Sequence, residues 1–262
     1  MRCSVIIPFK NRLISLYQAI SSVAAQTTAC HELILVNDGG EKPDINEINR
    51  FYGGVVQYVE LPYSHGAAVA RNKGAQQATG DVLCFLDSDD KWCKEHVETG
   101  LEILSAHPEV DFLATSYGEA TSSRKLHDGY GLFIVDNVAE FQFGNGGGFR
   151  TSGFILRKKS FWAVGGFDEH QEKHQDWDLA MRAWESGLTI GFNRQSLIVI
   201  NSDAEERMSY KPNPEASLRF YKNHKAFMDS GQRRAFRKGV LKTMLKSYRL
   251  SGWLTIAKIF LK

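Results

Sequence analysis

The sequence predicts an α/β domain built on a largely parallel sheet that is flanked by helices. Short apolar runs alternate with helical patterns from the N-terminus to Asp90, which is typical of a parallel sheet covered on both faces. The apolar runs end in polar or charged residues, which is expected where strands lead to a ligand site. With 262 residues, 43% of them hydrophobic, the chain is long enough for one large domain, or for a domain plus an appendage.

The elements of the first half follow one another regularly. Residues 3–7 are expected to form a strand that ends at Pro8, and a helix is expected over about residues 13–25. Further along come strands at 33–36, 55–59 and 82–86 and an alanine-rich helix at 66–78. Because ligands bind beyond the carboxyl ends of parallel strands, three segments are expected to meet in one crevice: Pro8–Arg12, Asp38 and Asp87–Asp90.

The second half is less regular. Strands are expected at 110–115 and 151–156, and the glycines of 144–148 predict a flexible loop, either a mobile wall of the ligand site or a plain connection. Residues 165–169 predict a turn. A helix is expected over Asp176–Trp184, because acidic residues at its start are favoured by the helix dipole.

The most informative stretch is the apolar run that ends in Asp87, Asp89 and Asp90. Burying such like charges unpaired costs on the order of several kcal/mol, so a positive group is expected among them. Oxygen-rich clusters suit Mg²⁺ or Mn²⁺. In extended backbone Asp87 and Asp89 point to the same side. The alternative for this short motif alone is a solvated acidic turn.

Several classes of protein are excluded by what the sequence lacks. No GxGxxG follows the first strand and no GxxxxGK[ST] occurs, so a dinucleotide oxidoreductase or a P-loop NTPase is not expected. The four cysteines form no CxxC pair and are expected to be free thiols in a reducing compartment. No secretory signal is visible, and Leu13–Cys30 is too polar for a membrane span. A cytoplasmic location is expected.

The net charge of +2 conceals a strong asymmetry. Residues 207–262 carry 14 Lys and Arg against 2 acids, while the other 206 residues carry 18 against 28. We therefore expect a catalytic domain over 1–206 and a basic helical tail over 207–262, because such a split is expected when one end meets an anionic surface.

The tail is also amphipathic. Apolar residues recur at helical spacing on one face, namely Phe236, Val240, Leu241, Met244, Leu245 and Tyr248. A basic amphipathic helix suits an anionic membrane surface. Two alternatives stay open: the apolar face packs on the body of the same chain, or the tail binds nucleic acid. No nucleic-acid motif is recognisable, so that last partner is not expected.

Six motifs occur in an order that matches one known family. They are Ser4–Pro8, Val36–Gly39, Ala70–Gly74, Phe85–Asp90 with Trp92, Gly165–Glu169 and Gln175–Asp178. On these residues, which span 3 to about 185, the chain resembles the inverting family 2 glycosyltransferases of bacterial surface polysaccharides. The resemblance implies a GT-A fold, which is a Rossmann-like, mixed, mostly parallel sheet flanked by helices.

The resemblance also implies a nucleotide-sugar donor, with UDP as the expected nucleotide. Asp38 would accept a hydrogen bond from the base, and Pro8 would frame base and ribose. Arg71 would face the nucleotide, and Asp87 would bind ribose or a metal-bound water. Taken singly, Asp38 is equally consistent with an Asx turn, and Arg71 with a solvated helix residue.

For the metal and the base, the resemblance makes Asp89 a direct ligand of Mn²⁺ or Mg²⁺ and Asp176 the general base. Asp90 is expected to be a helix cap or an outer partner. A late histidine ligand of the family has no counterpart here; Asp203 is its substitute, unless it belongs to a surface acidic loop. Taken singly, Asp176 is also explained as an acidic residue at a helix N-terminus that interacts with the helix dipole.

Three residues depart from the family pattern: Asn37 stands where Asp is common, Gly40 where Ser is common and Gln175 where Glu is common. The expected function is inverting transfer of a sugar to a hydroxyl of a growing, lipid-linked surface glycan such as O-antigen, capsule or lipopolysaccharide. The enzyme would then lie peripherally on the inner face of the cell membrane. The alternative is a catalytically silent nucleotide-sugar or glycan-binding protein of the same fold.

Overall fold

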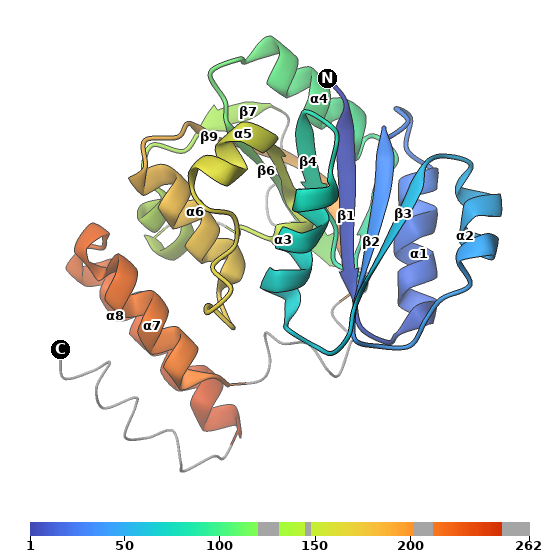
Figure 1. The fold of residues 1–262 in the computed structure, drawn as a ribbon. Coiled ribbons are helices and arrows are strands. Elements are labelled where there is room, and N and C mark those ends of the chain that lie inside the picture. Colours follow the sequence, from blue (N-terminus) through green and yellow to red (C-terminus); the bar gives the residue numbers. More distant parts are fainter. Residues whose placement is uncertain (120–130, 145–147, 202–211, 248–262) are drawn as a thin grey trace.

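The computed structural model describes residues 1–119, 131–144, 148–201 and 212–247. Within them, nine strands form one sheet in the order β3-β2-β1-β4-β8-β6-β9-β5, with β7 paired to β9 (Figure 1). The strands are β1 (Cys3–Phe9), β2 (Glu32–Asp38), β3 (Val56–Leu61), β4 (Val82–Phe85), β5 (Lys91–Trp92), β6 (Phe112–Glu119), β7 (Leu132–Ile134), β8 (Phe154–Arg157) and β9 (Ile190–Ile200).

The sheet is mixed, as expected, and its longer pairings are parallel. Strand β1 runs parallel to β2 and β4, β2 to β3, and β6 to β9. The antiparallel pairings are short and join β8 to β4 and β6, and β5 and β7 to β9. The parallel half therefore brings the carboxyl ends of β1, β2 and β4 to one edge.

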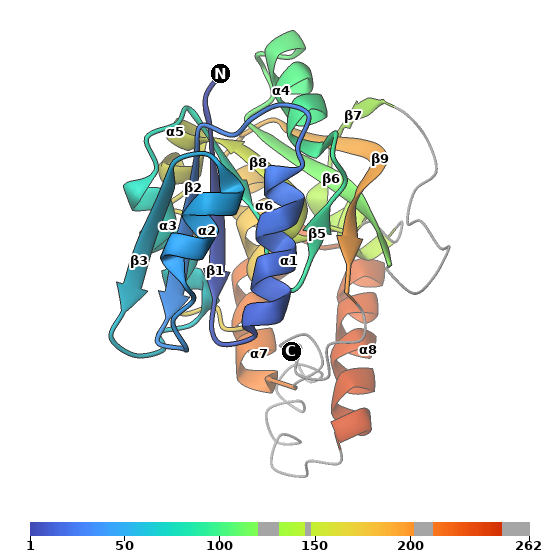
Figure 2. The ribbon, with the colours of Figure 1, turned by 90° about the vertical axis from the view of Figure 1, so that its right-hand side faces the viewer.

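Helices cover both faces of the sheet (Figure 2). They are α1 (Leu13–Ala24), α2 (Ile45–Tyr52), α3 (Ala67–Gln77), α4 (His96–Ala106), α5 (Lys158–Ala163), α6 (Gln175–Glu185), α7 (Pro214–His224) and α8 (Ser230–Ser247). Successive side chains of β1 point to opposite faces. Ile6 joins the core of α3 and α6, whereas Val5 and Ile7 join the core of α1, α2 and α4.

Some elements were not predicted, because their patterns are weak. In α2 only Ile48 is buried, and the helix is set by its cap, since the Asp44 carboxylate accepts from the amides of Asn46 and Glu47. Strand β9 has polar residues in its middle, which interrupt its apolar pattern. The strand expected at 151–156 is wrong at its start: Thr151–Gly153 form a 3₁₀ turn before β8.

The described part of the predicted tail shares a core with the sheet. Phe220 of α7 and Phe236 and Val240 of α8 are buried in the same apolar cluster as α6. Their apolar faces therefore pack on the body of the chain, one of the two alternatives to a membrane face. Arg234, Lys238 and Lys242 of α8 stay exposed. No helix among the described residues is long and apolar enough to cross a membrane.

Candidate active site

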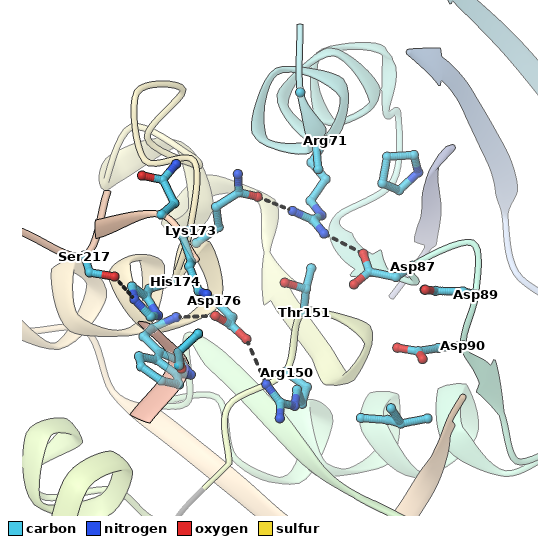
Figure 3. Close-up of a pocket in the computed structure, with 18 of the residues that line it drawn as sticks. Arg71, Asp87, Asp89, Asp90, Arg150, Thr151, Lys173, His174, Asp176 and Ser217 are labelled. Atoms are coloured by element: carbon cyan, nitrogen blue, oxygen red, sulfur yellow. Dashed lines mark hydrogen bonds and ion pairs between the residues drawn. The ribbon is translucent and has the colours of Figure 1, made fainter. Parts of the chain in front are cut away.

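A pocket of about 920 Å³ opens at the carboxyl ends of β1, β2 and β4. It brings together all the predicted site residues that the structure describes: Pro8, Asp38, Arg71, Asp87, Asp89, Asp90 and Asp176. Asp203, the predicted substitute ligand, lies outside the described residues. Most of the loop 144–148 also lies outside them. Figure 3 shows how the central side chains face one another.

At one end of the pocket, Asp38 organises the loop that leads into α3. Its carboxylate accepts hydrogen bonds from the Ser64 hydroxyl (2.7 Å) and from the amides of His65 (2.7 Å) and Gly66 (3.0 Å). These bonds run to a distant segment, so a local Asx turn does not account for Asp38. Gly39 has φ +67°, and a Cβ there would lie 2.5 Å from the Tyr63 carbonyl carbon, which favours glycine.

Two departures from the family pattern have a structural reason. The Asn37 side chain accepts from the Gly40 amide (2.7 Å) and donates to the Tyr58 hydroxyl (3.0 Å). An aspartate carboxylate at this position has no donor for the second bond. A Cβ at Gly40 would lie 2.6 Å from the Asn11 nitrogen. Larger residues than glycine are therefore excluded where the loops after β1 and β2 meet.

Arg71 connects the two halves of the pocket. Its guanidinium donates to Asp87 (2.5 Å) and to Gln175 (2.6 Å), and it lies over the Phe167 ring at 5.1 Å. It is buried, so it is not a solvated helix residue. Gln175, the third departure, is the acceptor that orients Arg71 from the start of α6.

Each aspartate of the cluster has its own partner. Arg12 donates to Asp89 (3.2 Å) from a backbone at φ +53°, a left-handed conformation that is unusual for arginine. Asp90 accepts from the Ser152 hydroxyl (2.6 Å) and is buried. No helix starts at Asp90, since α4 begins at His96, so the expected helix cap is wrong, and a role as an outer partner of a metal site stays a prediction. Sequence reasoning missed Arg12 as a partner of this cluster.

Asp176 lies in the first turn of α6. Its Oδ2 lies 3.9 Å from Nη1 of Arg150, and its Oδ1 accepts from the Trp177 amide (3.0 Å). Burial raises the pKa of the Asp176 carboxyl, and the positive charge of Arg150 offsets part of that rise. A carboxylate with a raised pKa is a better proton acceptor near neutral pH.

Sequence reasoning also missed His174, which precedes α6 at φ +63°. Its Nε2 lies 2.9 Å from the Ser217 hydroxyl, and its ring stacks on Trp177 at 4.5 Å. Burial lowers the pKa of His174 to about 3, so the imidazole is neutral. No sequence signal marks it, because several of its partners, such as Ser217 of α7 and Phe236 of α8, lie far along the chain.

The described residues contain no group of three or more His, Cys, Asp or Glu placed to hold a metal ion. Asp87 and Asp89 nevertheless both line the pocket, with side chains 34% and 16% exposed. Mg²⁺ is usually held by one or two carboxylates together with phosphate oxygens. The pair therefore fits an ion that a bound diphosphate would help to hold.

A mixed sheet of this order, with a carboxylate-lined pocket at its strand ends, defines the class of the GT-A transferases. The chain belongs to glycosyl transferase family 2, whose model matches residues 4–165. It is 28% identical to the amylovoran biosynthesis glycosyltransferase AmsB of Erwinia amylovora, over 74% of this chain and 67% of AmsB. It is 27% identical to the uncharacterized glycosyltransferase YwdF of Bacillus subtilis, over 80% of this chain and 78% of YwdF.

Solved structures show the same fold. The S. aureus TarS structure in complex with UDP-GlcNAc has a TM-score of 0.74 at 16% identity, over 99% of this chain and 79% of that chain. The family match ends at residue 165. Asp176, α7 and α8 therefore lie beyond it, and their place in the pocket comes from the fold.

Proposed function

We propose that the chain is an inverting, metal-dependent glycosyltransferase that moves a sugar from a UDP-sugar to a hydroxyl of a growing surface glycan. One observation carries the proposal: Asp38, Asp89 and Asp176, from three distant segments, line one pocket. The TarS complexes with UDP-GlcNAc and with UDP support a nucleotide-sugar donor.

The donor would occupy the end of the pocket with Pro8 and Asp38, where Asp38 would accept a hydrogen bond from the base. Arg71 and Arg12 would face the diphosphate with their positive charge. Asp89, with Asp87, would hold a Mn²⁺ or Mg²⁺ ion, which when bound stabilises negative charge on the diphosphate. Asp203 stays a prediction as a further ligand.

Asp176 would act as the general base. Its carboxylate would take the proton of the acceptor hydroxyl as the hydroxyl oxygen attacks the anomeric carbon from the face opposite the leaving group. The new glycosidic bond forms as the bond from the anomeric carbon to the phosphate oxygen breaks, and UDP leaves with that electron pair. A single displacement inverts the anomeric centre, so an α-linked donor gives a β-linked product.

For the acceptor, the name of AmsB places that relative in amylovoran biosynthesis, which supports a glycan acceptor here. We propose that the acceptor is lipid-linked and that the protein lies on the inner face of the cell membrane. The exposed Arg234, Lys238 and Lys242 support this proposal, because basic side chains near an anionic surface each contribute about 1 kcal/mol.

The membrane part is tested by replacing those three basic residues together with Gln. The replacement leaves Phe236 and Val240 in the core, so the fold is kept. In sedimentation with vesicles of phosphatidylglycerol and phosphatidylcholine, the triple variant should bind more weakly than the unchanged protein. Added salt should also weaken vesicle binding by the unchanged protein, because it screens the basic charges. Equal binding of the triple variant and the unchanged protein contradicts a basic membrane face.

The enzymatic part is tested by UDP release from a panel of UDP-sugars, with Mn²⁺, Mg²⁺ or EDTA. Release that depends on the metal and on one or a few sugars is expected. Binding of UDP-sugars with no release under any condition favours the catalytically silent alternative.

A further inference from the structure

Arg150 is a charged residue of the pocket to which the proposed reaction gives no role. It follows the loop after the helical turn of Glu140–Gly144 and precedes the 3₁₀ turn of Thr151–Gly153. Its Nη1 lies 3.9 Å from Oδ2 of Asp176, which is too far for a hydrogen bond. The Arg150 side chain is 40% exposed and faces the pocket (Figure 3).

Arg150 is held differently from the other arginines of the pocket. Arg71 and Arg12 each donate to a carboxylate, Asp87 and Asp89 respectively. The guanidinium of Arg150 makes no hydrogen bond to a carboxylate: it lies over the Tyr117 ring at 5.2 Å, a cation–π contact, and forms a long ion pair with Asp176 at 3.9 Å. Its Nε is buried and has no hydrogen-bond partner. Tyr117 therefore holds the positively charged guanidinium of Arg150 at the wall of the pocket.

This cation opposes the chemistry that Asp176 would perform. Burial raises the pKa of Asp176, and the charge of Arg150 counteracts that rise, which makes the carboxylate a weaker base. An anion bound at Arg150 would offset this charge and strengthen the base. Without a bound anion, the charge of Arg150 therefore lowers the basicity of Asp176.

The geometry indicates which substrate would bring the anion. In Figure 3, Arg71 lies above Asp176, beside Asp87, and Arg150 lies below it. The pocket is also lined by the aromatic rings of Phe143, Trp177 and Phe236, which contact one another, and by three small residues of α8, Ala235, Gly239 and Thr243. Aromatic rings with open space beside them suit a sugar ring. In the proposed reaction this part of the pocket would receive the acceptor, because the donor would occupy the end with Pro8 and Asp38.

We propose that Arg150 binds an anionic group, a carboxylate or a phosphate, on the acceptor sugar that offers its hydroxyl to Asp176. The inference rests on the proposed function and specifies its acceptor class. A planar guanidinium binds either anion through two parallel N–H donors. Binding places the acceptor next to the base and increases the basicity of that base.

The test compares binding of matched probes to the full-length protein in the presence of UDP and Mn²⁺. The probes are methyl β-D-glucoside, methyl β-D-glucuronide and methyl β-D-glucoside 6-phosphate, titrated by NMR. We expect at least one charged probe to bind about tenfold tighter than the neutral one, since hydrogen bonds to charged groups contribute that much or more. Arg150→Gln should remove the preference, and Arg150→Lys should keep part of it.

Arg194→Gln is the matched control, because Arg194 also lies over a ring, that of Phe133 at 4.8 Å, but not in the pocket. It should keep the full preference. The charged probe that binds more tightly shows whether the anionic group of the acceptor is a carboxylate or a phosphate. Equal binding of all three probes by the unchanged protein, or an unchanged preference in Arg150→Gln, overturns the inference. Absence of UDP binding in the same samples contradicts the proposed function instead.

Discussion

The Nε2 atom of His174 lies 2.9 Å from the Ser217 hydroxyl and joins the residue before α6 to α7. A second link lies further along, where His224 of α7 contacts Asp178 and Glu185 of α6. Because Asp176 lies in the first turn of α6, α7 helps to position the candidate base. The candidate active-site pocket therefore depends on residues beyond the family match.

The first prediction concerns α8 as part of the core. Phe236→Ala removes a ring that is 4% exposed and should lower the free energy of unfolding by about 3 kcal/mol, measured by urea denaturation. Phe227→Ala, at a ring 45% exposed, is the control and should have a much smaller effect. Equal effects of both variants would show that α8 does not pack as described.

The second prediction is a pH dependence of stability from His224. Burial lowers the pKa of this imidazole, but its bonds to Asp178 and Glu185 outweigh that effect and raise the pKa overall. The folded state therefore holds the proton more tightly than the unfolded state. The stabilisation is fully present below the unfolded pKa of about 6.5 and is lost as pH rises through the folded pKa.

His224→Gln should reduce this pH dependence and cost about 2 kcal/mol at pH 6, measured by urea denaturation between pH 5.5 and 9. His170→Gln, at an exposed histidine, is the matched control. A His224→Gln profile parallel to that of the unchanged protein contradicts a protonated bridge.

Much of the first half of the fold follows from the sequence, because buried parallel strands have continuous apolar runs. The convergence of Pro8, Asp38 and Asp87 then follows from the common direction of β1, β2 and β4. The role of α8 does not follow, since an amphipathic face has the same pattern whether it meets a membrane or a protein core. The burial of Phe236 and Val240 distinguishes the two.

The partners of the site residues could not be predicted from the sequence, because they come from distant segments. Local patterns identify carboxylates such as Asp89, but not the cation that comes from a distant loop, here Arg12. Arg150 belongs to no sequence motif, and its proximity to Asp176 and Tyr117 is visible only in the structure. Long-range contacts decide these roles.

The third prediction concerns the metal. Asp89→Ala should reduce Mn²⁺-stimulated UDP release by about 100-fold or more, because it removes a ligand of an ion that stabilises the leaving diphosphate. The fold should be kept, as checked by circular dichroism. Asp136→Ala, at an exposed carboxylate outside the pocket, is the control. Near-normal release with unchanged metal dependence excludes Asp89 as a ligand.

The fourth prediction is the pH profile of turnover. The base works when deprotonated, so activity should fall as pH drops through the pKa of Asp176, which burial raises above the usual value of about 3.9. Arg150→Gln removes a charge that lowers this pKa, so the acid limb of kcat/KM should move to higher pH. An unmoved limb would show that Arg150 and Asp176 are not coupled.

The most direct test of the account is Asp176→Asn, with UDP binding and UDP release measured on the same protein. The variant nearly preserves shape but removes the proton acceptor. The account predicts that UDP binds with unchanged affinity while release from the UDP-sugar that the unchanged protein uses falls by about 10² to 10⁴. Release at the unchanged rate, or loss of UDP binding together with turnover, would contradict Asp176 as the base.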